Sequence, residues 1–187
     1  MAYKGVLDDF RAAIGLKTPS HVPIVALGEE FDVRVCGGGV TYNEYNRNAK
    51  IMSEVQIAAV KRFGYDWSWL QVDDCMVYEV LGVEVIGQGD ILPATCGYLP
   101  ATRETLNSLP GVDPKKDGRL PVLLEALKRI KDEFGDTVAV VGRTEAPFSS
   151  VALLYGIEET MLLPYTDPEL LIDTLKYFVE IQTAFGL

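Results

Sequence analysis

Trp67-Ser68-Trp69-Leu70-Gln71-Val72-Asp73-Asp74 is the stretch that decides the fold of this chain. Its apolar and aromatic residues run at strand length and stop at two adjacent carboxylates, which predicts a β-strand over residues 67–72. Because neighbours in a strand point to opposite faces, Gln71 and Asp73 share a face with the two tryptophans. Parallel α/β proteins present side chains to ligands at the C-terminal ends of their strands. One of the two aspartates also suits the cap of the following turn or helix.

Helical and strand patterns alternate on both sides of this stretch. Hydrophobic spacing predicts helices over residues 4–14, 43–63, 120–134 and 148–163, a final helix opened by the capping sequence Thr166–Glu169, and short strands over residues 22–27, 83–86 and 137–141. Residues 87–110 are expected to form an excursion over the surface. The alternation favours a parallel sheet with helical crossovers.

The number of strands limits the architecture. The apolar strand at 137–141 is expected to be buried on both faces, as in a parallel sheet. Three principal strands cannot close a barrel, and a complete (β/α)8 barrel needs about 250 residues. From the pattern alone, the chain is either a small open α/β sheet or the first part of a longer chain, and we expect a single domain over residues 1–187.

Composition and charge restrict the partners. The chain has 187 residues, of which 48% are hydrophobic and 24% charged, as in a globular protein rather than a disordered one. Its formal net charge of −10 disfavours nucleic acid and anionic membranes as partners. No apolar run approaches the roughly 18 residues of a membrane span, and the N-terminus is too polar for a signal peptide. We expect a soluble, cytoplasmic protein.

The cysteines and the single histidine do not form a metal motif. Cys36, Cys75 and Cys96 are widely spaced, without a C-x-x-C, so reduced thiols are expected rather than disulfides. His21 precedes the first predicted strand, where a surface or capping role is expected. The sequence therefore predicts no zinc site formed by this segment alone.

Four motifs, in order along the chain, resemble the first half of the uroporphyrinogen decarboxylase superfamily. His21-Val22-Pro23-Ile24 resembles its R-V-P-V strand, and Arg62–Asp66 leads into the acidic strand as in the family. Tyr78–Gly82 resembles E-A-L-G, and Val141–Ser149 resembles I-G-F-x-G-x-P-F-T. The resemblance spans nearly the whole chain. It implies a TIM-barrel fold, of the (β/α)8 type, of which this sequence carries only the first strands and helices.

The superfamily contains the decarboxylase of haem synthesis and the cobalamin-dependent methyltransferases such as methylcobalamin:coenzyme M methyltransferase. In the decarboxylase an arginine-rich segment follows the first strand and grips the substrate carboxylates. Here Gly28–Arg34 is acidic and contains a single arginine, so it would repel a polycarboxylate porphyrinogen. The resemblance is therefore closer to the methyltransferase branch. That branch implies a corrinoid (cobalamin) as substrate or donor. Its zinc would be held only by the second half of the barrel in a full-length chain.

The candidate site residues follow from the strand ends and from this resemblance. Counting back from Leu81-Gly82 places the family's catalytic aspartate on Asp73, with Asp74 as the alternative. Gln71 shares the face of Asp73 and is a candidate for substrate binding. Arg143 and Glu145 stand where the family has an aromatic residue and a glycine. The two are expected either to bind substrate in one cavity, Arg143 clamping an anion, or to form an internal salt bridge.

Three functional hypotheses remain open. The first is a methyltransferase, or a fragment of one, that moves a methyl group between a corrinoid or corrinoid protein and a small acceptor, with Arg34 as a further substrate-binding residue. The second is uroporphyrinogen decarboxylase in porphyrin and haem biosynthesis. The third is a non-catalytic half-barrel that serves as a binding module. Because half a barrel leaves strand edges and apolar faces uncovered, we expect a homo-oligomer or a requirement for a C-terminal half.

Overall fold

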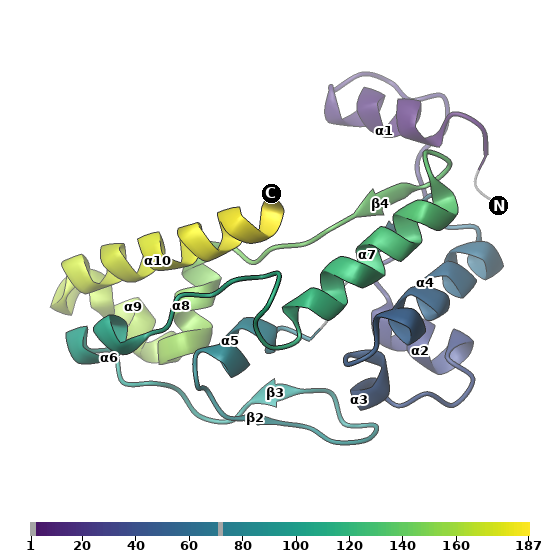
Figure 1. The fold of residues 1–187 in the computed structure, drawn as a ribbon. Coiled ribbons are helices and arrows are strands. Elements are labelled where there is room, and N and C mark those ends of the chain that lie inside the picture. Colours follow the sequence, from purple (N-terminus) through teal and green to yellow (C-terminus); the bar gives the residue numbers. More distant parts are fainter. Residues whose placement is uncertain (1–2, 71–72) are drawn as a thin grey trace. The chain divides into compact units, whose positions relative to one another are not determined.

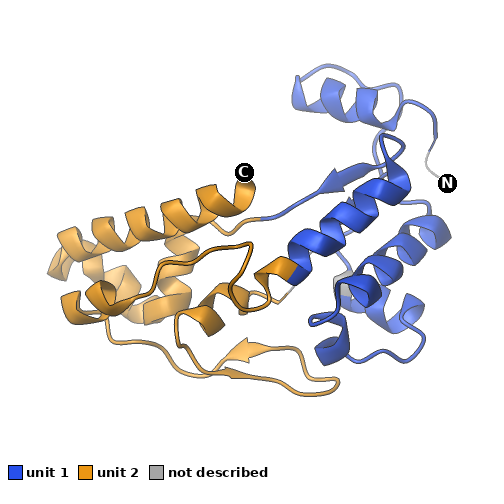
Figure 2. Cartoon of the chain, in the orientation of Figure 1, with its two compact units in different colours: residues 1–72, 122–143 blue, residues 73–121, 144–187 orange. Residues whose placement is uncertain are grey.

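The computed structural model describes residues 3–70 and 73–187, and Figure 1 shows how its elements follow one another. The elements are α1 (Val6–Ile14), α2 (Glu29–Cys36), α3 (Tyr42–Tyr45), α4 (Ala49–Phe63), β1 (Trp67–Trp69), α5 (Met76–Val80), β2 (Val85–Ile86), β3 (Ala94–Thr95), α6 (Arg103–Ser108), α7 (Leu120–Phe134), β4 (Ala139–Val141), α8 (Pro147–Tyr155), α9 (Ile157–Thr166) and α10 (Pro168–Gly186). The chain forms two compact units. Unit 1 comprises residues 1–72 and 122–143, and unit 2 comprises residues 73–121 and 144–187 (Figure 2).

A parallel pair of strands forms the centre of unit 1. β1 pairs with β4, with Ser68 opposite Val140. Ser68 and Leu70 are buried, and α4 packs against β1. The parallel pairing confirms the crossover predicted from the alternation of helices and strands. β4 is half-buried along its length, so the expectation that it is buried on both faces is wrong for this structure.

The apolar segment over residues 22–27 does not form the predicted buried strand. Ile24 exchanges hydrogen bonds with Asp66: its N–H donates to the carboxylate at 2.7 Å, and its carbonyl accepts from the Asp66 N–H at 2.9 Å. The indole of Trp67 also donates to the Ala26 carbonyl. These contacts hold the segment beside β1, but they do not form the continuous series of backbone hydrogen bonds of a β-ladder. Val22 and Leu27 remain exposed because no described element covers them.

The long helix predicted over residues 43–63 is two helices, α3 and α4. Thr41 caps α3 in a capping box with Glu44, so a first helix begins there. The Asn48 side chain then accepts from the N–H groups of Lys50 and Ile51, which begins a second helix. Hydrophobic periodicity does not detect such a break, because the apolar stripe continues through it. Gly64 ends α4 at φ +70°, as predicted.

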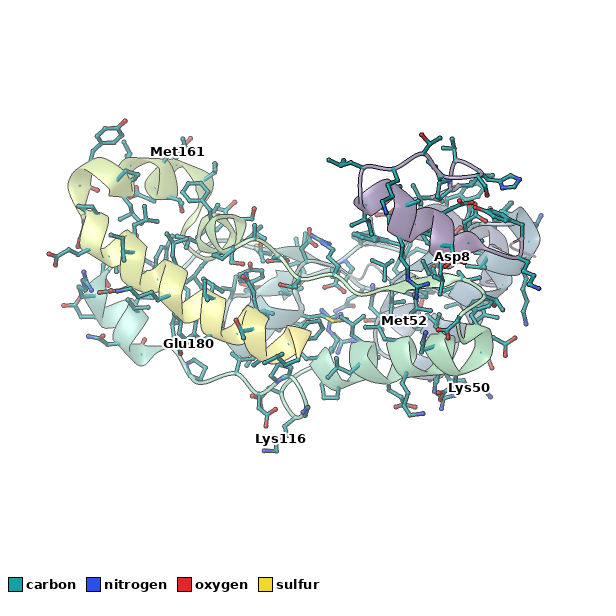
Figure 3. The ribbon with its side chains drawn as sticks, turned by 90° about the horizontal axis from the view of Figure 1, so that it is seen from above. Asp8, Lys50, Met52, Lys116, Met161 and Glu180 are labelled. Carbon is teal, nitrogen blue, oxygen red and sulfur yellow. The ribbon has the colours of Figure 1, made fainter. Side chains whose placement is uncertain are left out.

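The side chains of α4 are buried on one face of the helix. Met52 and Ala59 are fully buried, whereas Lys50 is exposed (Figure 3). In α1, Val6 and Asp9 are buried, whereas Ile14 near the helix end is exposed. Four donors converge on the Asp9 carboxylate, namely the Tyr3 hydroxyl, the Ser20 N–H and hydroxyl, and the His21 N–H. The ends of this N-terminal segment are therefore tied to one carboxylate.

Unit 2 has a core of helices. Tyr78 of α5, Val151 and Leu154 of α8, and Leu170 and Phe178 of α10 are buried together in one cluster. The excursion over residues 87–110 is partly ordered, because β3 pairs antiparallel with β2 and Thr102 caps the short helix α6. At the start of α10 the N-cap is Asp167, whose side chain accepts from the Leu170 N–H, with Pro168 in the first turn.

The single helix predicted over residues 148–163 is interrupted at Gly156. Gly156 has φ +91° and ψ 148°, which an L side chain rarely adopts, and it ends α8 and begins α9. A Cβ at this position would lie 3.0 Å from the ring of Tyr98. Both the backbone conformation and the neighbouring ring therefore require glycine.

We predict that Gly156→Ala lowers the free energy of unfolding by about 1–3 kcal/mol, because it adds backbone strain and a steric contact. Gly111→Ala is the matched control, since Gly111 has no such backbone conformation and a Cβ there meets nothing within 4 Å. Chemical denaturation of both variants measures the difference. Equal midpoints and slopes for the two would contradict this account of the break.

Candidate functional site

Asp73, which lies between β1 and α5, forms an ion pair with Arg119. Arg119, directly before α7, donates from Nη1 to Asp73 Oδ2 at 2.6 Å and from Nη2 to Asp73 Oδ1 at 2.8 Å. Its Nε donates to Glu79 Oε2 at 2.7 Å. The side chains of Arg119 and Asp73 are only 7% and 2% exposed. This is a buried, bidentate ion pair extended by a second carboxylate.

The surroundings of this pair explain its charge state. Burial opposes the charged guanidinium, but the hydrogen bonds to Asp73 and Glu79 outweigh it and raise the pKa of Arg119 above its usual range. Asp73 also accepts from the Cys75 N–H at 3.1 Å, which is the local capping role expected of one aspartate. Burial and the Asp73 charge raise the pKa of the Cys75 thiol to about 12, so this cysteine stays protonated. Asp74 is exposed at the surface of unit 2.

Glu145 lies in a second polar cluster of unit 2. The Tyr78 hydroxyl donates to Glu145 Oε2 at 2.5 Å, and the Ser150 hydroxyl approaches the same oxygen at 3.4 Å. Gln182 of α10 donates from Nε2 to Ser150 Oγ at 2.9 Å. Tyr78 and Ser150 are buried, and Glu145 is half-buried. A partly exposed carboxylate is thus held from its buried side by uncharged groups.

Tyr78 is an obligate donor in this cluster. Burial, followed by the negative charge of Glu145 and the hydrogen bond to it, raises the pKa of Tyr78 far above its usual range. The phenol therefore remains protonated and donates to the carboxylate. Such an O–H bond to a carboxylate is short and strong.

The remaining predicted residues are in unit 1 or outside the described residues. Arg143 is half-buried and is the last residue of unit 1, whereas Glu145 belongs to unit 2. Arg34 is exposed on α2, with its guanidinium 5.1 Å from the centre of the Tyr42 ring. Gln71 lies outside the described residues.

The acidic segment over residues 28–34 contains a buried carboxyl group. Asp32 is 4% exposed and is part of α2, which lies against α4. The Tyr65 hydroxyl is 3.4 Å from Asp32 Oδ1. Burial raises the pKa of Asp32 to about 6, and hydrogen bonds from Tyr65 and Gln56 only partly offset it. No hydrogen bond to a cation is among the contacts described for this group.

Three of the residues that build these clusters were not identified as site residues from the sequence, namely Arg119, Ser150 and Gln182. Tyr78 had appeared only as part of the E-A-L-G resemblance. An arginine just before a predicted amphipathic helix is an ordinary feature, so sequence offers no sign that Arg119 pairs with Asp73 over 46 residues. Within the described residues, no group of three or more histidine, cysteine, aspartate or glutamate side chains is placed to hold a metal ion, and no helix is long and apolar enough to cross a membrane.

Comparison with known proteins decides the family. The model of the uroporphyrinogen decarboxylase (URO-D) family matches residues 7–186. The chain belongs to the uroporphyrinogen decarboxylase family. It is 27% identical over 125 residues to uroporphyrinogen decarboxylase of Anaeromyxobacter dehalogenans (strain 2CP-C), covering 64% of this chain and 35% of that protein. It is 22% identical over 177 residues to methylcobamide:CoM methyltransferase MtaA of Methanosarcina barkeri, covering 94% of this chain and 52% of that protein.

A solved structure confirms the fold class. A methyltransferase from Methanosarcina mazei superposes with a TM-score of 0.82 at 23% identity, covering 97% of this chain and 54% of that one. The predicted α/β fold of the TIM-barrel type is confirmed, and so is the predicted relationship to the URO-D family with its methyltransferase branch. The chain spans between about a third and a half of the length of the curated relatives described above.

We predict that Asp73→Asn lowers the free energy of unfolding by about 2–4 kcal/mol, because it removes a charge from a buried pair and leaves Arg119 with Glu79 alone. Glu180→Gln is the control, since Glu180 is exposed on α10 and the change should be within about 0.5 kcal/mol. Urea denaturation measures both. If Asp73→Asn unfolds at the wild-type midpoint, the ion pair makes no net contribution to stability.

We predict that Asp32→Asn stabilises the protein at pH 8. The folded-state pKa of Asp32 is raised to about 6, above its unfolded value, so its favourable contribution is present below about pH 4 and is lost as pH rises through 6. At pH 8 the ionised group costs about 1–3 kcal/mol, which the neutral amide avoids. Melting temperatures at pH 4 and pH 8 test this. A stabilisation equal at both values would contradict it.

Proposed function

We propose that this chain is part of an enzyme that transfers a methyl group between a corrinoid and a small acceptor. The observation that carries the proposal is the similarity to the methylcobamide:CoM methyltransferase, which extends over 94% of the chain, whereas the similarity to the decarboxylase extends over 64%. The segment over residues 28–34 also supports it. Its acidic character, with Arg34 as the single arginine, is unsuited to a polycarboxylate substrate.

The candidate residues divide into two roles. Arg143 is proposed to clamp an anionic group of the substrate, since a guanidinium matches a carboxylate or phosphate bidentately. Glu145 and Arg34 are proposed to contact substrate, and Gln71 remains a candidate on the strand face. For catalysis, Asp74 is exposed to solvent, whereas the bidentate pair with Arg119 gives Asp73 a structural role that competes with a catalytic one.

The corrinoid enters this proposal as a substrate or donor, carried by a separate corrinoid protein. Zinc is not assigned to this segment, because no described cluster offers the thiolate and imidazole ligands that a zinc site requires. In our proposal the ligands for an activating metal come from the second half of a full-length barrel. We further propose a cytoplasmic enzyme that assembles as a homo-oligomer or with that second half.

Decarboxylation is the second candidate function. The 27% identity to the Anaeromyxobacter decarboxylase favours it. So does the count back from Leu81-Gly82, by which the resemblance places the family's catalytic aspartate on Asp73. The third candidate is a non-catalytic half-barrel that serves as a binding module. An activity assay distinguishes each of these two candidates from a methyltransferase.

We predict that the full-length protein transfers the methyl group of methylcobalamin to a small thiol and releases no carbon dioxide from uroporphyrinogen. Loss of the methylcobalamin absorption spectrum with formation of the thioether measures the first reaction, and porphyrin chromatography measures the second. Decarboxylation without methyl transfer would establish the second candidate. Absence of both reactions, in a folded and metal-loaded protein, would favour the binding module.

We predict that Arg143→Lys raises KM for an anionic acceptor by about tenfold while kcat changes little, because lysine keeps the charge but loses the planar fork. Arg129→Lys is the matched control, since Arg129 pairs with Glu125 on the solvent side of α7. Steady-state kinetics and melting temperatures are measured on both. An Arg143→Lys protein with wild-type KM and a lower melting temperature would show that Arg143 has a structural role.

A further inference from the structure

The helix α9 (Ile157–Thr166) is exposed over most of its surface, although most of its residues are apolar. Of its ten residues, all of which the structure describes, Thr160 and Leu163 alone are buried. Leu163 belongs to the core cluster of unit 2. A helix that is apolar on every side is normally covered on every side. α9 therefore presents more apolar surface than the core of its own unit uses.

The exposed apolar residues of α9 lie together on the side opposite the core. Residues four apart are neighbours on a helix surface, so Ile157, Met161 and Tyr165 form a continuous row with Leu162 beside it. Their exposed fractions are 57%, 55%, 88% and 52% respectively. We call these four residues the α9 face, and Figure 3 shows the position of Met161 on it.

The residue types of the α9 face are those of a protein-binding surface. Single exposed apolar residues are ordinary, whereas a contiguous group of large ones marks a site of interaction. The flexible side chain of Met161 can adapt to a partner, and Tyr165 offers a large ring at a low cost in conformational entropy. Methionine and tyrosine are also enriched at protein interfaces.

Negative charge borders the α9 face. Glu158 and Glu159 are exposed in the first turn of α9. The sequence contains no lysine, arginine or histidine between Arg143 and Lys176. Arg103 of α6 reaches this part of unit 2, but its guanidinium donates to Asp173 of α10 at 2.6 Å. A complementary partner therefore combines an apolar surface with positive charge.

The same charge argues against two other occupants. A second copy of the chain would bring its own Glu158 and Glu159 to the face, and like charges across an interface repel. An anionic lipid surface would be repelled by these carboxylates in the same way. A helix with basic residues beside an apolar stripe meets both requirements, because helices pack through rows of side chains such as the one on α9.

We propose that the α9 face binds an amphipathic helix of a partner protein, whose apolar side covers Met161 and Tyr165 and whose lysine or arginine residues approach Glu158 and Glu159. Binding at this face requires no methyl transfer. It can therefore be measured whether or not the proposed reaction occurs.

The experiment uses synthetic peptides of about 18 residues, long enough to form a helix on binding. The first contains leucine and lysine in the order that gives an amphipathic helix. The second has the same composition in an order without a helical stripe, and the third has glutamate in place of lysine. Fluorescence anisotropy with the full-length protein measures each affinity. Wild-type protein is expected to bind the first peptide about tenfold more tightly than either of the others.

Two double variants test the two parts of the α9 face. Met161→Ser with Tyr165→Ser removes the apolar contact and should weaken binding of the first peptide about tenfold. Glu158→Gln with Glu159→Gln keeps the size of both side chains, and it should weaken binding and lower its dependence on salt. Because all four side chains are exposed, the melting temperature should change little.

Each variant has a matched control in unit 2. Ile91→Ser with Leu92→Ser removes two exposed apolar side chains between β2 and β3, away from α9 in the sequence. Glu104→Gln with Glu180→Gln removes two exposed carboxylates from α6 and α10. Both controls should bind the first peptide as wild type does. A general attraction between a cationic peptide and an acidic protein would instead weaken equally in the two glutamate variants.

Four results would overturn the proposal. They are absence of binding to wild-type protein, equal binding of the three peptides, binding unchanged by Met161→Ser with Tyr165→Ser, and equal effects of the two glutamate variants. Sedimentation velocity addresses the second copy. A wild-type dimer that dissociates in the Met161→Ser and Tyr165→Ser variant would show that the chain itself covers the α9 face, which also contradicts the proposal.

Discussion

The buried ion pair between Arg119 and Asp73 is the interaction on which the organisation of unit 2 depends. Asp73 lies between β1 and α5, and Arg119 directly precedes α7. Glu79, which is in α5, accepts a further hydrogen bond from Arg119. Burying these charges costs solvation energy, so the pair is stable only while its geometry is complete. The bidentate arrangement and the third hydrogen bond from Nε provide that geometry. Loss of Arg119 would leave the buried Asp73 carboxylate without its guanidinium partner, whereas loss of Asp73 would leave Arg119 with Glu79 alone.

Unit 2 thus uses two carboxylates in different ways. Asp73 faces a guanidinium and is almost fully buried, which suits a structural element. Glu145 is half-buried and accepts a hydrogen bond from the buried Tyr78 hydroxyl. The segment over residues 28–34 is acidic, so it would repel a polycarboxylate substrate.

The sequence predicted the class of most elements and failed where a local interaction overrides periodicity. The helix end at Gly64 and the helix over residues 120–134 were predicted correctly because their signals are local. The strand predicted over residues 67–72 begins at Trp67 as expected but ends at Trp69, and residues 71–72 lie outside the described residues. The breaks at Asn48 and Gly156 were missed because a cap and a backbone angle end helices within a continuous apolar stripe.

The candidate site was predictable only in part, for a related reason. Strand ends and family motifs indicate where polar groups gather, so Asp73 and Glu145 could be selected from the sequence. Their partners come from positions 46 and 67 residues away along the chain, for Arg119 and Tyr78 respectively, and no spacing rule links such positions. The surroundings of each carboxylate therefore become known only from the folded structure.

A double-mutant cycle between Asp73 and Arg119 tests the central claim most directly. Asp73→Asn, Arg119→Gln and the double variant are compared with wild type by urea denaturation, which isolates the energy of the pair from the effects of each change alone. The account predicts a coupling energy of about 2 kcal/mol or more, because the pair is buried and bidentate. Additive effects, with a coupling energy near zero, would show that Asp73 is not held by Arg119 and would restore it as a free carboxylate for catalysis.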